Sequence, residues 1–230
     1  MTRLAFHIQC ALMVALAALM LFPATVKGKE KTRTPQPLTF SELQVGGELQ
    51  QRLNKNFARL EETKYQPDNV FLTMKQSGDW PGDTEGRTIL GLVLDAQAGH
   101  FAPQYLDEIV RRIPAHMNEK GYMGPIYQGF LHEQQLSGNG WMLRGLCEYY
   151  LWKKDPQVLD EIRTIACHLF LAGRGYYAQY PILPELRKQN VGGASGSIAG
   201  LQGYWQISSD IGCVFIGMDG LIQAYGILKE

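Results

Sequence analysis

Two glycines separated by four residues occur three times in this chain, and each pair lies in an apolar, helix-like stretch. The pairs are Gly86/Gly91, Gly140/Gly145 and Gly212/Gly217. Short polar segments precede all three pairs. Repetition on this scale predicts an array of helical hairpins in which every second helix begins with polar side chains. Those helix starts are expected to converge on one mouth and to form a pocket for a polar ligand.

Hydrophobic periodicity predicts six helices and no convincing strand. The expected helices run from Ser41 through the stripe that ends at Leu60, and then over 84–98, 102–118, 139–153, 156–172 and 210–228. The second, fourth and sixth are apolar on nearly every side, which is typical of helices buried all round. The third and fifth keep one polar face. This alternation predicts an all-α toroid of α/α hairpins, of which three hairpins are about half of an (α/α)6 barrel.

The glycine pairs also indicate how the helices pack. A glycine inside a helix costs about 1 kcal/mol relative to alanine. Six such positions at fixed spacing indicate that the inner helices need to approach closely. Because inner-helix flanks would otherwise be exposed, we expect residues 41–230 to be the N-terminal part of a longer barrel domain, a fragment lacking the catalytic centre, with the remainder of the barrel as a partner.

The N-terminal residues are typical of a secretory signal. Arg3 precedes an unbroken apolar run from Cys10 to Phe22, which is shorter than the ~20 residues needed to cross a bilayer. We expect a signal peptide at 1–28, a charged linker at 29–40, and a secreted or periplasmic protein with no stable membrane span after cleavage. A signal anchor that is never cut is the alternative.

Composition excludes several classes of protein. Lys+Arg and Asp+Glu are both 22, so no net charge favours nucleic acid as a partner. Cleavage would leave Cys147, Cys167 and Cys213, which form no disulfide framework and no metal-ligand motif. Cys147 and Cys213 are expected to be buried. No cofactor is expected in this chain.

The first candidate set for binding lies before the second helix. Carboxylates accept hydrogen bonds from sugar hydroxyls, a guanidinium donates them, and an indole ring packs on the C–H face of a sugar. Trp80, Asp83, Glu85 and Arg87 supply these groups. Helix capping by Asp83 or Thr84, with Glu85 favoured by the helix dipole, is the alternative.

Two further sets precede the later inner helices. His132 lies just before the fourth helix with Asn139 after it, and Asp210 lies at the start of the sixth. A neutral imidazole can hydrogen-bond a ligand, although a loop histidine is often only solvated. Asp210 is either a first-turn acid or a ligand residue. No HExxH motif, phosphate loop or nucleophile elbow is present.

At these residues the chain resembles glycoside hydrolase family 127, the β-L-arabinofuranosidase-like proteins. The likeness rests on three segments: Trp80–Ala96 with its two spaced acids, Gly121–Tyr122–Met123 followed by His132–Glu133 and Glu148–Tyr149–Tyr150, and Ser208–Tyr225. His132 matches the family histidine. Asn139 stands near a second position that is commonly histidine, and Asp210 replaces another.

The resemblance implies an (α/α)6 six-hairpin glycosidase, a retaining enzyme with a zinc-bound cysteine nucleophile and a glutamate acid/base. Nothing in this sequence matches that cysteine cluster, so zinc is expected only in a full-length relative. We therefore expect a glycoside hydrolase-like protein that acts on polysaccharide side chains, and carry over binding positions alone. The alternatives are a non-catalytic carbohydrate-binding or scaffolding protein, a polysaccharide lyase-type toroid, and a helical-repeat interaction protein.

Overall fold

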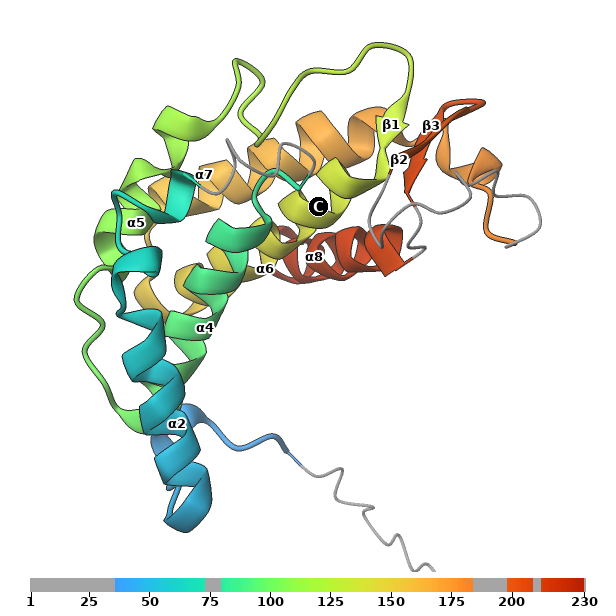
Figure 1. Ribbon diagram of the computed structural model, residues 1–230. Helices are drawn as coiled ribbons and strands as arrows, with labels where there is room; N and C mark the ends of the chain where they lie inside the picture. The colour runs from blue at the N-terminus through green and yellow to red at the C-terminus, as the bar shows by residue number, and fades with distance from the viewer. Residues whose placement is uncertain (1–35, 73–79, 184–197, 209–211, 230) are drawn as a thin grey trace, which may run out of the picture. The chain divides into compact units, whose positions relative to one another are not determined.

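The computed structural model describes residues 36–72, 80–183, 198–208 and 212–229. The expected signal peptide, most of the expected linker and Asp210 lie outside these residues. Thr39–Glu230 forms one compact unit, and its described part is mostly helical (Figure 1). The all-α expectation is confirmed at this level.

Each predicted helix has a counterpart in the described residues. The six are α2 (Gly47–Leu60), α4 (Asp83–Gly99), α5 (Leu106–Arg112), α6 (Glu133–Lys153), α7 (Pro156–Ile165) and α8 (Gly212–Leu228). Short 3-10 turns lie at Phe40–Glu42, Thr63–Tyr65, Val70–Leu72, Ile113–His116, Leu171–Gly173 and Tyr177–Gln179, and a π turn, η5, follows α7 at Ala166–Phe170. Pro156 is the first residue of α7, as predicted, and Asp155 accepts a hydrogen bond from the Gln157 backbone N–H.

The predicted start of the fourth helix was wrong. The helix α6 begins at Glu133 rather than at residue 139, because His132 is its N-cap and accepts a hydrogen bond from the Gln135 backbone N–H. Gln135 in turn donates from its side-chain amide to the Met123 and Pro125 carbonyls. The polar residues 133–135, which periodicity favours as a loop, are therefore buried in the first turn of a helix.

The helices α4 and α8 both run alongside α6 in the same direction as it, and glycines make these contacts close. A Cβ placed on Gly86 of α4 would lie 2.3 Å from the Met142 backbone nitrogen of α6. One on Gly145 of α6 would lie 2.6 Å from the Gly86 carbonyl oxygen. Gly82 lies beside Gly138 at the helix starts, so α4 and α6 are parallel. The predicted close approach is confirmed at Gly86 and Gly145, whereas Gly91 packs against the Leu60 side chain of α2.

The contact between α6 and α8 uses glycines as well. A Cβ on Gly140 would lie 2.6 Å from the Ile216 carbonyl oxygen, and one on Gly220 would lie 2.4 Å from the Gly140 carbonyl oxygen. Gly220 stands outside the repeated pattern. The sequence repeat therefore identifies the helices that pack closely but not every glycine that forms the contact.

A small sheet precedes the inner helices, so the prediction of no strand was wrong. Its strands are β1 (Leu131–His132), β2 (Ile198–Gln202) and β3 (Trp205–Ser208), in the order β1-β3-β2. The strand β1 pairs in parallel with β3, and β2 pairs with β3 antiparallel. Strands of two, five and four residues show too little alternation to detect by periodicity. The sheet joins the chain segments that lead into α6 and α8.

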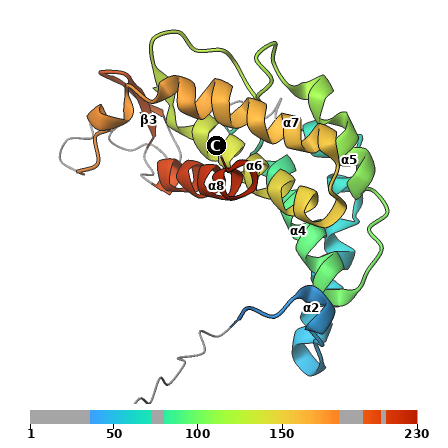
Figure 2. The same cartoon turned by 180° about the vertical axis from the view of Figure 1, so that it is seen from behind.

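The remaining helices cover the layer formed by α4, α6 and α8. The short helix α5 packs on α4, whereas α7 runs along α6 and α8 (Figure 2). The helix α2 packs on α4, where Leu60 contacts Gly91 and Asn56 donates to Asp95 over 2.5 Å. Cys147 and Cys213 are buried, as predicted.

Candidate functional site

A buried asparagine fixes the starts of α4 and α6 against each other. The Asn139 side-chain amide donates to the Gln135, Met123 and Pro81 carbonyls, and its oxygen accepts from the Met123 backbone N–H at 2.9 Å. Its side chain is fully buried. Backbone groups therefore engage the amide completely, and Asn139 positions the loop at Pro81 and Gly82 that leads into α4.

Gly82 caps α4 in a left-handed conformation with φ of 91°, so neither Asp83 nor Thr84 is the predicted cap. Only glycine adopts this conformation without strain. Asp83 is the first helical residue, and Arg87 one turn later donates to it from Nε at 3.1 Å. Burial raises the pKa of Asp83, while Arg87 opposes that rise.

Arg87 also stacks on a tryptophan of the neighbouring helix. Its guanidinium carbon lies 4.5 Å from the ring centre of Trp141 on α6. Arg144, also on α6, lies 5.2 Å from the same ring and forms an ion pair with Asp219 of α8 at 3.0 Å. Arg87 of α4 and Arg144 of α6 thus both lie against one indole ring, and the contact with Trp141 helps to hold Arg87 in place.

Asp83 and Arg87 both line a cavity between α2 and α4 with a volume of about 350 Å³. Asn56, Arg59, Lys64 and Tyr65 line it from α2 and the turn after it. Thr84 and Thr88 add hydroxyl groups from α4, and Leu60 and Gly91 add an apolar patch. A small cavity that combines polar groups with a limited apolar surface is suited to a polar ligand.

Glu85 lies on the buried side of α4. Its side chain is fully buried, and neither carboxyl oxygen has a hydrogen-bond partner within the described residues. Burial raises the pKa of Glu85 to about 7, and the nearby charge of Asp83 adds to the shift. The residue therefore stands in the same turn as Asp83 without lining the cavity.

His132 and Trp80 lie near the start of α6 but not on this cavity. The imidazole of His132 stacks on Tyr127 with ring centres 5.0 Å apart. The Trp80 carbonyl accepts a hydrogen bond from the Asp83 backbone N–H, and the Trp80 side chain is half-buried. Asp210 lies outside the described residues. A binding role for His132, Trp80 and Asp210 stays a prediction.

The structure thus brings two of the seven predicted residues, Asp83 and Arg87, into one cavity. It adds lining residues that the sequence analysis missed, chiefly Arg59, Lys64 and Tyr65. Their signal was weak, because charged residues on an amphipathic helix are usually only solvated. Trp141 was missed as the partner of Arg87 because only the close contact of α4 with α6 brings them together.

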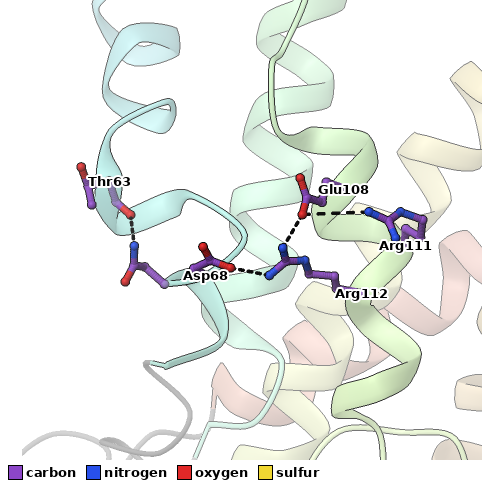
Figure 3. Close-up of polar contacts among 6 residues, drawn as sticks. Thr63, Asp68, Glu108, Arg111 and Arg112 are labelled. Atoms are coloured by element: carbon purple, nitrogen blue, oxygen red, sulfur yellow. Dashed lines mark hydrogen bonds and ion pairs between the residues drawn. The ribbon is translucent and has the colours of Figure 1, made fainter.

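A second polar cluster, around Arg112, has a structural explanation. Figure 3 shows Arg112 of α5 between Glu108, one turn earlier, and Asp68, whose carboxylate lies 2.6 Å away. Arg112 therefore ties the segment after α2 to α5. No group of three or more His, Cys, Asp or Glu side chains within the described ranges is arranged to hold a metal ion.

A second cavity, bordered by α8, is lined by apolar rather than charged side chains. It has a volume of about 320 Å³ and is lined by Ala166, Cys167, Leu171, Leu221, Ile222, Tyr225 and Leu228. Ile222 and Tyr225 of α8 are 68% and 65% exposed. This apolar groove lies between α8 and the turns that follow α7.

Comparison with known proteins finds no family model, no curated protein and no solved structure that matches the chain. Within the described residues, no helix has both the length and the apolar character needed to cross a membrane.

Proposed function

We propose that this chain is a carbohydrate-binding protein of the glycoside hydrolase-like, helical-hairpin type, and that a sugar binds in the cavity between α2 and α4. The proposal rests on one observation: the Asp83–Arg87 pair, singled out from the sequence as a sugar-binding group, lines a polar cavity of about 350 Å³. The family resemblance supports the same class of ligand.

The proposed architecture is an α/α toroid with α4, α6 and α8 as its inner helices. Their common direction and their glycine contacts support this arrangement, as do α5 and α7, which follow α4 and α6 in the chain and pack outside them. The proposed activity extends to binding alone, because the resemblance assigns the catalytic cysteine and glutamate to a part of the barrel that nothing in this sequence matches.

The cavity supplies what a sugar needs for recognition. The Asp83 carboxylate accepts hydrogen bonds from hydroxyl groups, and the Arg87 guanidinium, fixed by Asp83 and Trp141, donates them. A fixed donor loses little conformational freedom when the ligand binds. Leu60 offers an apolar contact for a sugar C–H face.

The test is glycan binding by the purified protein and two matched variants. Arg87→Gln removes a cavity donor, whereas Arg52→Gln removes the same type of i,i+4 ion pair from an exposed face of α2. We expect Arg87→Gln to weaken glycan binding about tenfold and Arg52→Gln to leave it unchanged. The proposal fails if no glycan binds, or if both variants bind as tightly as the unmodified protein.

A further inference from the structure

We infer that the cavity between α2 and α4 selects acidic sugars, those carrying a carboxylate, over neutral sugars of the same backbone. This inference rests on the proposed function, which places a sugar in that cavity. It adds the charge of the ligand, which the Asp83–Arg87 pair alone does not specify.

The charges around the cavity do not balance. Arg59, Lys64 and Arg87 line it, and the one carboxylate among its described lining residues is Asp83. Arg87 already pairs with Asp83. Arg59 and Lys64 form no ion pair with any described residue. Two cations therefore line the cavity with no carboxylate paired to them among the residues that the structure describes.

Three other acids belong to the same elements but do not line the cavity. Asp95 accepts a hydrogen bond from Asn56, Glu61 accepts one from the backbone N–H of Gln104, and Glu62 is exposed. A carboxylate on the ligand is thus the group that can contact Arg59 and Lys64 from within the cavity.

A neutral sugar and an acidic sugar differ in how they compensate Arg59 and Lys64 for the water that binding removes. A neutral ligand that covers Arg59 and Lys64 removes water from them without providing a charge in return. A carboxylate replaces that water with charge-assisted hydrogen bonds, which are about twice as strong as neutral ones. Thr84 and Tyr65 line the same cavity, and their hydroxyl groups can form hydrogen bonds with the sugar hydroxyls.

The experiment is calorimetric titration with matched pairs of oligosaccharides. Linked oligomers of galacturonic and glucuronic acid are compared with the same oligomers in which the carboxyl groups are methyl-esterified, and with inorganic sulfate alone. We expect one acidic oligomer to bind at least about tenfold more tightly than its ester, and this preference to decrease as salt is raised.

Two variants test where the preference comes from. Arg59→Gln and Lys64→Gln are each expected to weaken binding of the acidic oligomer about fivefold to tenfold, and to leave binding of the ester as tight or slightly tighter, because the cost of desolvating a cation is removed. Lys55→Gln, an exposed position on the same helix outside the cavity, is the control and is expected to change neither. All three side chains are exposed, so the fold is expected to persist, and circular dichroism checks this.

The outcomes separate the inference from the proposed function. If acid and ester bind equally and Arg87→Gln weakens both, a sugar binds here but the acidic selectivity is overturned. If no oligomer binds, the sugar site and its selectivity fail together. Sulfate that binds as tightly as the acidic oligomer and displaces it would mean a simple anion site, which overturns the inference as well.

Discussion

The helices α4 and α8 both pack on α6 through glycines, yet their other sides carry opposite chemistry. The helix α4 borders α2 across a cavity lined by charged and hydroxyl side chains. The helix α8 borders a groove lined almost entirely by apolar side chains. Glycine-mediated packing on α6 therefore occurs in one helix that borders a polar cavity, where we propose that a sugar binds, and in one that borders an apolar groove.

This difference separates the backbone contacts that stabilise the fold from the helix faces whose side chains are free to vary. Where α4 and α8 meet α6, backbone atoms approach so closely that no side chain fits. On their other sides, side chains determine the chemistry and can change without affecting that packing. The predictions below test this division, in order of decreasing effect.

The largest effect is expected at the contact between α4 and α6. In Gly86→Ala the new Cβ would lie 2.3 Å from the Met142 backbone nitrogen, so the helices must separate. We expect a loss of about 3 kcal/mol or more in the free energy of unfolding. Gly226→Ala on α8 is the matched control, because its Cβ meets nothing within 4 Å. That variant should gain about 0.5 kcal/mol from helix propensity, as measured by urea denaturation.

Equal losses in the two glycine variants would contradict this account. They would mean that glycine matters in these helices for a reason other than close approach. A loss confined to Gly86→Ala would support the view that backbone contact between inner helices stabilises the layer.

The second prediction concerns the effect of Glu85, on α4, on how the free energy of unfolding depends on pH. Its pKa of about 7 in the folded protein lies above the ordinary 4.5, so the folded protein keeps a proton that the unfolded chain releases. Its effect on stability is therefore unfavourable and develops as pH rises from about 4.5 to 7. Glu85→Gln should raise the free energy of unfolding at pH 8 by on the order of 2 kcal/mol and change it little at pH 4.

Denaturation of Glu85→Gln and of the exposed-site control Glu62→Gln across pH 4–8 checks this prediction. The difference between the unmodified protein and each variant isolates that residue from other acids, such as Glu161, whose pKa burial also raises to about 7. A pH-independent difference for Glu85→Gln would show that folding does not shift the pKa of this carboxyl.

The sequence predicted the helices well and the site only partly. Glycine spacing and apolar composition identify α4, α6 and α8 as closely packed because both features act within a single helix. The cavity was not predictable in the same way. Arg59 and Lys64 join Asp83 and Arg87 only because Leu60 of α2 packs on Gly91 of α4. Neither helix propensity nor hydrophobic periodicity predicts that contact.

The position of Asn139 illustrates the same limit. It was predicted to bind a sugar because a polar residue before an apolar stretch resembles a helix start at a pocket. In the structure it lies in the second turn of α6, where its amide bonds to the Pro81 and Met123 carbonyls. Two separate segments supply those carbonyls, one leading into α4 and one between α5 and α6, and their paths depend on tertiary packing.

The third prediction tests the contact that fixes Arg87. Because Arg87 stacks on Trp141 at 4.5 Å, the two side chains should be energetically coupled. A double-mutant cycle with Arg87→Met and Trp141→Leu should give a coupling energy of about 0.5–1 kcal/mol. The control cycle pairs Trp141→Leu with Arg52→Met on α2 and should give a coupling near zero. Zero coupling in both cycles would mean that Asp83 alone positions Arg87.

The smallest effect on stability is expected in the apolar groove. Ile222 of α8 and Leu49 of α2 are both 68% exposed, but Ile222 lines the groove of 320 Å³ and Leu49 does not. Replacing either by Gln should change the free energy of unfolding by no more than about 0.5 kcal/mol. Binding of a hydrophobic dye such as ANS should fall in Ile222→Gln alone, because only there does the substitution interrupt a continuous apolar surface. Equal dye binding by the two variants would show that the α8 side is no more apolar to a ligand than the α2 side, and the contrast between the two sides would then rest on the polar cavity alone.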